Sequence, residues 1–464
     1  YLHAADWLRN VAEWLQRNPT RWVTLAVVFY LVSTLLSTAL SESFSVSMWG
    51  LVPGQDTYPA YTMICYVVLF GVIAAHVRSK AQVERLLWAI AFMGVMVGGY
   101  SAAQHYGYDY FTLLENPGTQ RSGSTMGNAI VAGAVLLITL PVSLAAGTAA
   151  IDASNGSPRV RRITTVWVLV LAIQILGIIF TFSRGPWIGT TIAMSSLLAL
   201  VLLTLGWRRF SRAVTLLGLA SIAVTLVLLV PAEAISGARP TARSSFADRQ
   251  PAPAPLIPSL SGSISSIGQE MLTLSGQKAS ETDGPAWSLG AFGALSGRID
   301  IWGTSARLIV QRPWFDFENP RLPILRPLIG YGPDMFKYTY LLERTPRGRD
   351  RTLVSERFAH NILIHQGVEL GILGLLTIFG LFAVPAIVGG YQLLHKKYSD
   401  AIFFHLLMLG MMAALAGRFV EQMLGVAAVP DQTIYWALLA IFAALPIAAG
   451  TTRSSIGSIL IEPA

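Results

Sequence analysis

The chain has 464 residues, of which 53% are hydrophobic and only 12% are charged, and its mean hydropathy is +0.55. This composition excludes a soluble globular domain and predicts an integral membrane protein. A net charge of +8 would suit a nucleic-acid partner only if the basic residues formed one patch, and they are instead spread over many short connections. The single cysteine, Cys65, lies in an apolar run, which excludes an internal disulfide and a thiolate metal cluster.

Ten apolar runs are long enough to cross a hydrocarbon core of about 30 Å, which needs about 20 residues of helix. They lie near residues 22–40, 59–77, 85–103, 127–149, 163–181, 187–205, 213–231, 361–393, 401–416 and 432–450. The eighth run is over-long and predicts a helix that tilts or extends past the headgroups. The predicted fold is therefore all-α, a polytopic transmembrane helix bundle.

Three parts of the chain are expected from these runs: seven spans in residues 1–231, a large extracytoplasmic loop in residues 232–360, and three spans in residues 361–464. The first residue, Tyr1, is not Met, and no secretory signal follows it. We therefore expect that an N-terminal piece of the protein precedes this sequence.

Lysine and arginine orient the predicted bundle, because short cytoplasmic connections carry an excess of them. One set of connections holds fifteen: Arg9, Arg17, Arg21, Arg78, Lys80, Arg85, Arg159, Arg161, Arg162, Arg208, Arg209, Arg212, Lys396, Lys397 and Arg453. The short connections of the other set hold three: Arg121, Arg184 and Arg418. The first set is placed in the cytoplasm and the second outside, together with the long loop, which is exempt from the charge bias.

The second half of the long loop contains two patterned segments. Residues 296–313, SGRIDIWGTSARLIVQRP, predict an amphipathic helix in the membrane interface with Arg298 in its first turn. Its expected apolar positions are Ile299, Trp302, Ala306, Ile309 and Val310. Residues 327–336, PLIGYGPDMF, predict a tight turn around Tyr331 near the membrane.

Four arginines and a histidine are thus expected at one membrane face: Arg121, Arg184, Arg298, Arg418 and His360. Arginine stays charged and binds phosphate oxygens with a planar fork of donors, so a lipid diphosphate at headgroup depth would suit this set. The alternative for each arginine is a snorkelling anchor for ordinary lipid phosphates, and for the histidine a hydrogen bond to a backbone carbonyl. A hairpin bounded by Gly185 and Pro186 favours the binding interpretation for Arg184.

Five segments carry a resemblance to a known family: SRGPWIG, QRSGSTMGNAIVAGA (residues 120–134), SGRIDIW, IGYGPDMF and AHNILIHQGVELGILGLL. In order and spacing, over about residues 120–380, they resemble the O-antigen ligase and polymerase family. The resemblance implies a GT-C-like bundle in the bacterial inner membrane. It also implies transfer of a glycan from an undecaprenyl diphosphate carrier to a glycan or glycolipid acceptor, outside the membrane and without a metal or other cofactor. The family usually has twelve spans, which would place two before Tyr1.

The resemblance also implies roles for single residues. Arg184 in SRG and Arg298 in SGR match the family's diphosphate-binding arginines, and His360 in AHN matches its proposed catalytic histidine. Arg121, Arg418 and Tyr331 are further candidates for substrate binding, because they are expected at the same face.

The expected chemistry follows from the donor. A diphosphate leaving group needs stabilisation of its negative charge, which Arg184 and Arg298 would supply. The acceptor hydroxyl must lose a proton, and His360 would be the general base. Direct attack from the side opposite the diphosphate would invert the anomeric centre. Glu369 would lie opposite His360 on a straight helix, so we expect a structural hydrogen bond for it.

Four other interpretations remain open at this point. A polymerase would use the same donor with a different acceptor. A small-anion transporter is favoured less, since no internal repeat or mid-depth charge cluster is evident, and a purely structural membrane subunit would make the arginines replaceable. A metal-dependent transferase would need paired acids such as Asp316 and Glu318, whose alternation with aromatic residues is more typical of an exposed edge.

Overall fold

The computed structural model describes residues 20–111, 121–229, 290–315, 323–343, 356–395 and 401–450. Every regular element in these ranges is a helix. Asp316 and Glu318 lie outside the described residues, so the paired-acid alternative stays untested.

Nine helices of the described part are long and apolar enough to span a membrane. They are α2 (Arg21–Ala39), α5 (Lys80–His105), α6 (Ala129–Ala153), α7 (Val160–Phe180), α8 (Arg184–Leu205), α9 (Trp207–Leu229), α16 (Gly371–Leu394), α17 (Ile402–Gln422) and α18 (Val429–Ala448). A shorter apolar helix, α4 (Ala60–His76), coincides with the second predicted span. The prediction of an all-α polytopic bundle is confirmed.

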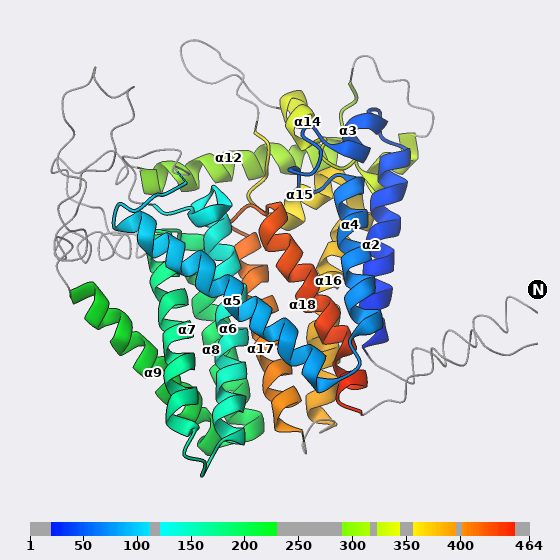
Figure 1. The fold of residues 1–464 in the computed structure, drawn as a ribbon. Coiled ribbons are helices and arrows are strands. Elements are labelled where there is room, and N and C mark those ends of the chain that lie inside the picture. The colour runs from blue at the N-terminus through cyan, green and yellow to red at the C-terminus, as the bar shows by residue number, and fades with distance from the viewer. Residues whose placement is uncertain are drawn as a thin grey trace, which may run out of the picture.

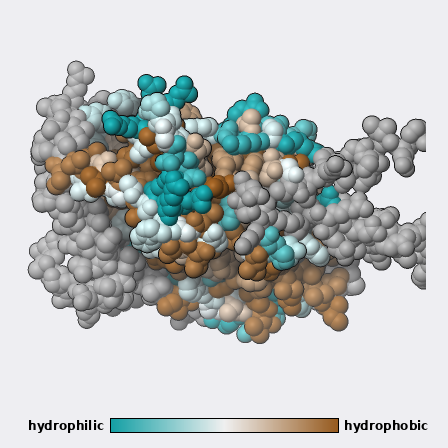
Figure 2. Space-filling view, turned by 90° about the horizontal axis from the view of Figure 1, so that it is seen from below, coloured by the Kyte–Doolittle hydropathy of each residue, from teal (hydrophilic) through white to brown (hydrophobic). Residues whose placement is uncertain are grey.

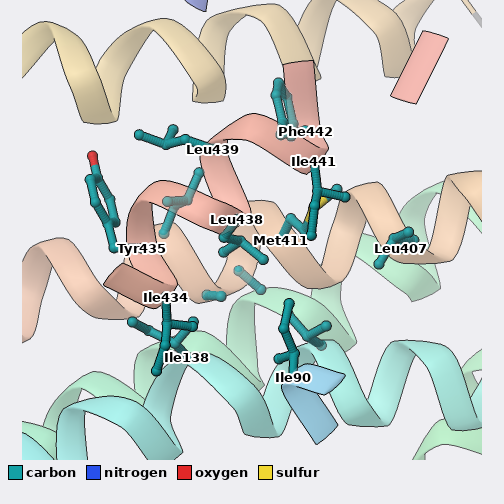
Figure 3. Packing of buried hydrophobic residues seen from close by; sticks show 14 of the residues in the cluster. Ile90, Ile138, Leu407, Met411, Ile434, Tyr435, Leu438, Leu439, Ile441 and Phe442 are labelled. Carbon is teal, nitrogen blue, oxygen red and sulfur yellow. The ribbon is translucent and has the colours of Figure 1, made fainter. Parts of the chain in front are cut away.

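Helix α6 forms the centre of the bundle because it is apolar on all sides, and every residue from Val131 to Ala149 is buried. Helices α17 and α18 are also mostly buried, whereas α8 and α9 leave most of their apolar surface exposed. Figure 3 shows side chains of α5, α6, α17 and α18 meeting in this core. The exposed apolar faces of the outer helices are the surfaces expected to face lipid.

Small residues bring α8 close to α17. The α carbon of Gly189 packs against Gly417, and a β carbon added at Gly189 would lie 2.7 Å from the Gly417 carbonyl oxygen. Such small pairs permit close approach of membrane helices. Arg184 is the first residue of α8, so this contact also fixes its position. Gly185 and Pro186 belong to the first turn of α8 and do not bound the hairpin as expected.

The eighth predicted span is two helices, which corrects the expectation of one over-long tilted helix. Helix α15 (Ile362–Glu369) ends at Leu370, and α16 begins at Gly371, whose φ is +66°. Gly330 and Gly332 dock against this break, and the Gly332 amide donates to the Glu369 carbonyl over 2.8 Å. The break persists because backbone groups freed from the helix bond to another segment.

Short helices gather at one end of the bundle, where α12 (Gly290–Gln311) lies across the ends of the long helices (Figure 1). The others there are α3 (Phe44–Trp49), α14 (Phe336–Glu343) and α15 (Figure 1). We call this end the α12 end.

Helix α12 buries a different face from the one predicted. Ile301, Ser305 and Leu308 are buried, whereas Ile299 and Val310 are exposed. Hydrophobic spacing alone predicted the wrong face, because the polar residues Thr304 and Ser305 lie on the buried face. The Ser305 hydroxyl donates to the Ile301 carbonyl one turn earlier in α12. Arg298 also lies about two turns into the helix and not in its first turn.

The opposite end carries the short basic connections. Asp152 at the end of α6 pairs there with Arg209 and Arg212 of α9. Viewed from this end, hydrophilic residues form patches beside apolar residues (Figure 2). We call it the basic end.

Candidate active site at the α12 end

Arg184 and Arg121 lie on two segments that are bonded together. The Arg121 guanidinium donates to the Ser183 hydroxyl over 2.9 Å, and the Ser122 amide donates to the Phe180 carbonyl over 3.0 Å. Ser183 directly precedes Arg184 at the start of α8. Phe182 has a φ of +45°, so the turn between α7 and α8 is strained. The two arginines are therefore held at one place by the backbone of this turn.

Arg298 approaches them from α12 and is half-buried. Its pKa is lowered, first by burial and then by the positive charges of Arg184 and Arg121, while the Glu421 carboxylate opposes the shift. No carboxylate of the described residues lies within ion-pair distance of the Arg298 guanidinium. Three guanidinium groups from distant segments thus form one electropositive site.

His360 is held beside this site by its two neighbours in the chain. The Trp302 indole, one turn after Arg298 on α12, donates to the Ala359 carbonyl over 2.8 Å. Asn361 caps α15 by accepting from the Ile364 amide over 3.1 Å. Between these anchors the backbone of His360 takes a φ of +52°, a strained conformation typical of functional sites.

The electrostatic surroundings keep the His360 imidazole neutral. Burial, followed by the charges of Arg298 and His365, lowers its pKa to about 4. Its Nδ1 atom is buried and has no hydrogen-bond partner in the described ranges. The ring is therefore unprotonated near neutral pH.

A small recess opens beside His360. It is lined by the loop before α15 and by the ends of α4 and α17, with Tyr58, Phe358, His360, His365, Gln422 and Val426 among its residues. A second small recess, lined by Tyr30, Met63 and Trp436 among others, shares Tyr58 and Gln422 with it.

Arg418 does not join the electropositive site. It lies inside α17, fully buried, and pairs with Glu421 and Asp431. The expectation that it occupies a short external connection was wrong, because its two acidic partners allow the guanidinium to be buried within the bundle. Its two terminal guanidinium nitrogens are engaged in this cluster, and we do not carry a substrate-binding role for it forward.

The contacts of Tyr331 are with residues other than Arg121, Arg184 and Arg298. It is 2% exposed, its hydroxyl donates to the Pro313 carbonyl over 2.8 Å, and the Arg326 guanidinium stacks 4.5 Å from its ring centre. Its amide donates to the Val368 carbonyl. These contacts hold the tight turn against α15, so Tyr331 contributes to the scaffold of the site.

Glu369 makes the structural hydrogen bond that was expected. One carboxylate oxygen accepts from the Phe336 amide over 3.2 Å, and the other lies 3.3 Å from His365 Nε2. Because Glu369 lies at the break between α15 and α16, this bond helps to fix the start of α14 against that break.

Sequence reasoning missed three residues that line or shape the site: Trp302, His365 and Gln422. Trp302 follows Arg298 by one helical turn, and His365 follows His360 by five residues, so both offered a signal. Gln422 offered none, because its place in the recess depends on packing between α17 and the loop before α15.

The fold and the site define a multi-pass membrane protein with a cluster of arginines beside a neutral histidine at one end. A family model described as O-antigen ligase matches residues 167–315. These residues are thus similar to the O-antigen ligase family, a group of membrane glycosyltransferase-like ligases and polymerases. The match contains Arg184 and Arg298 and ends before His360, so it is narrower than the resemblance over residues 120–380. No curated protein sequence matches the chain.

Proposed function

We propose that this chain is an inverting, metal-independent glycosyltransferase of the O-antigen ligase type. It would transfer a glycan from an undecaprenyl diphosphate carrier to an acceptor hydroxyl at the α12 end, which we assign to the periplasmic face. The observation that carries the proposal is Arg298, half-buried beside Arg184 and Arg121 without a carboxylate partner in the described ranges. A guanidinium in this setting is stabilised by an anionic ligand.

The proposed reaction is a single displacement. The acceptor oxygen forms a bond to the anomeric carbon while the bond from that carbon to the diphosphate oxygen breaks. The diphosphate leaves with the electron pair, and its growing negative charge is stabilised by Arg184, Arg298 and Arg121. The acceptor proton passes to His360, which is neutral because its pKa is lowered to about 4.

A lipid diphosphate suits these arginines better than a water-soluble anion does. The site lies at the end of the bundle, where a lipid diphosphate would sit at headgroup depth with its glycan toward water. The positive charge of the arginines also supplies what a divalent ion would otherwise supply, which is the basis for proposing that no metal takes part.

The test compares Arg298→Ala with Arg307→Ala in proteoliposomes that contain undecaprenyl diphosphate-linked glycan and an acceptor. Arg307 is a matched control on the same helix, partly exposed and 3.4 Å from Glu343. We expect Arg298→Ala to lower turnover by about 10²- to 10³-fold, the typical cost of a lost transition-state donor, and Arg307→Ala to retain it. Equal turnover in both variants would contradict the proposal.

Controls in the same assay separate the other functions. Product with inverted anomeric configuration and turnover unaffected by a chelator are expected, whereas activity restored only by a divalent ion would favour the metal-dependent alternative. Transfer to lipid A core would indicate a ligase, and transfer to a lipid-linked repeat unit would indicate a polymerase. Solute flux without consumption of donor would indicate a transporter.

A further inference from the structure

We propose that His365 and Glu369, acting through one water molecule in the recess, hold the tautomer of His360 that the proposed reaction needs. In that tautomer the proton lies on Nδ1, and the lone pair of Nε2 is left for the acceptor hydroxyl. The inference rests on the proposed function and deepens it, because it assigns two positioning residues to the base.

The contact between His365 and Glu369 sets the direction of the chain of hydrogen bonds. Both side chains are buried, at 4% and 1% exposure, and they lie one turn apart on α15. His365 Nε2 lies 3.3 Å from one carboxylate oxygen of Glu369. This distance exceeds the roughly 2.7–2.9 Å of a strong charge-assisted bond, yet neither atom has a hydrogen-bond partner elsewhere in the described ranges. A proton on Nε2 satisfies both atoms, and Nδ1 of the neutral ring is then an acceptor.

Three buried nitrogen atoms belong to residues that line the recess. They are His360 Nδ1, His365 Nδ1 and Gln422 Nε2, and none has a hydrogen-bond partner among the residues that the structure describes. Buried polar atoms without partners are rare in native proteins and call for an explanation. The recess has room for about one water molecule, and a buried water typically makes about three hydrogen bonds. One water can therefore satisfy all three nitrogen atoms.

The hydrogens available on these groups decide which way each bond runs. Gln422 Nε2 can only donate, so the water oxygen accepts from it, and His365 Nδ1 accepts, so the water donates to it. His360 Nδ1 then completes the chain as a donor to the second lone pair of the water. Every bond from His360 onward now points toward the Glu369 carboxylate, whose charge polarises and strengthens the chain. The opposite tautomer of His360 would reverse one bond and break that alignment.

The chemical consequence lies at Nε2 of His360. A neutral imidazole accepts a proton at the nitrogen that carries none, so a proton held on the buried Nδ1 makes Nε2 the base. When Nε2 takes the acceptor proton, the ring becomes positive, and the nearby charge of Arg298 opposes this. No proton reaches the Glu369 carboxylate in this step, and its negative charge stabilises the imidazolium through the chain. The buried carboxylate of the Ser-His-Asp triad likewise holds a tautomer without taking the proton.

The experiment is ¹⁵N NMR of the histidine-labelled full chain in detergent, because the shifts of the two ring nitrogens distinguish the two neutral tautomers. His360→Gln assigns the His360 signals by their loss. We expect the wild type at neutral pH to show His360 with its proton on Nδ1 and His365 with its proton on Nε2. A wild-type His360 with its proton on Nε2 would overturn the inference, and this measurement needs no variant to fold.

Glu369→Gln is the sharpest variant, since it should reverse the chain. The Phe336 amide donates to one Glu369 oxygen over 3.2 Å, so the amide oxygen of the new side chain takes that place and its NH₂ group faces His365. His365 Nε2 must then accept and its Nδ1 donate. The water oxygen, already accepting from Gln422 and His365, has no lone pair left for His360. We therefore expect the His360 proton to move to Nε2 and kcat to fall by about 10²- to 10⁴-fold, the contribution of a general base.

Asp334→Asn is the matched control for the loss of a buried acid. Asp334 is 8% exposed, and burial followed by the charge of Glu369 raises its pKa, but its carboxylate accepts from the Leu51 amide and it does not line the recess. Its φ of +59° also suits asparagine. We expect the His360 tautomer and kcat to match the wild type. A reversal in both variants would show that charge alone controls the ring, which would contradict the inference.

A second variant covers the case in which Glu369→Gln does not fold. His365→Phe keeps a ring against Tyr58 and Phe336, whose ring centres lie 4.8 Å and 4.9 Å from that of His365, and it removes both nitrogen atoms. His360 should then show both tautomers, with kcat lowered by about 3- to 10-fold, the range of one hydrogen bond. Size-exclusion profiles establish that each variant is folded. Unchanged His360 signals in either folded variant would overturn the inference.

Two further readouts separate this inference from the proposed function. Arg298→Ala should lose turnover and keep the His360 tautomer, because the arginine does not line the recess. In a wild type that consumes no lipid-linked glycan, a His360 proton that moves from Nδ1 to Nε2 in Glu369→Gln would remove the enzyme and keep the chain of hydrogen bonds. In an active wild type, the same movement with kcat unchanged would contradict the positioning role.

Discussion

At the scale of single residues, the surroundings of each arginine decide its role. Arg418 is fully buried with two carboxylates, and removal of its charge would leave two buried acids without a partner. Arg298 is half-buried, and the charges of Arg184 and Arg121 disfavour its own charge more than the Glu421 carboxylate favours it. An anionic ligand would therefore stabilise it. Both are arginines near the same end of the bundle, yet only the second has the setting of a ligand-binding group.

The pH dependence of turnover is predicted from His360. The His360 imidazole stays neutral as the pH falls to about 4, because burial and the charge of Arg298 lower its pKa to about 4. With donor limiting, kcat/KM should therefore hold through pH 6.5 and fall only near pH 4. The bound diphosphate adds negative charge beside the ring and raises its pKa, so the acid limb of kcat should lie at higher pH than that of kcat/KM.

Measured pH–rate profiles with His360→Gln as the control check this prediction. The variant should retain only a slow residual rate without the acid limb, since general-base catalysis typically contributes about 10²- to 10⁴-fold. An acid limb of kcat/KM near pH 6.5 in the wild type would argue against His360 as the base.

At the scale of elements, α12 joins the two halves of the site. It carries Arg298, and one turn later Trp302 bonds the carbonyl of Ala359 next to His360. On the other side of His360, Asn361 caps α15 and its amide nitrogen lies 3.4 Å from the Met423 carbonyl at the end of α17. The strained backbone of His360 is thus held between α12 and α17, and Trp302 acts as a positioning residue.

Substitution Trp302→Phe tests this coupling, because it keeps an aromatic ring and removes the indole donor. We expect kcat to fall about 3- to 10-fold, the range of one hydrogen bond, with the donor KM little changed, since Arg298 stays in place. Steady-state kinetics measure both quantities. A merely structural tryptophan would instead lower thermal stability and leave kcat of the folded fraction unchanged.

At the scale of the whole molecule, the two ends of the bundle differ in what they carry. The basic end holds short connections rich in arginine and lysine, and the α12 end holds the electropositive site and the recess. The short helices also lie at the α12 end (Figure 1). The positive-inside bias assigns the basic end to the cytoplasm. A donor glycan would then have to be presented on the periplasmic face before this chain could use it.

Cysteine labelling tests the orientation. In a Cys65→Ala background, Tyr110→Cys places one thiol near the α12 end at a position that is 76% exposed, and Asn155→Cys places one in the exposed connection between α6 and α7. A membrane-impermeant maleimide added to spheroplasts should label the first and reach the second only after permeabilisation. The reverse pattern would place the site in the cytoplasm and exclude the proposed periplasmic reaction.

Hydropathy and charge, read along the sequence, determined the helix bundle and ten of its apolar helices, because each span needs only its own 17 to 26 residues to be apolar. Tertiary structure alone decided which polar groups meet. The buried face of α12, the break at Gly371, the burial of Arg418 and the recess at Gln422 all depend on contacts between segments far apart in the chain. Whether a side chain is buried or paired depends on the residues that surround it in the fold. A local sequence pattern does not specify which distant residues those are.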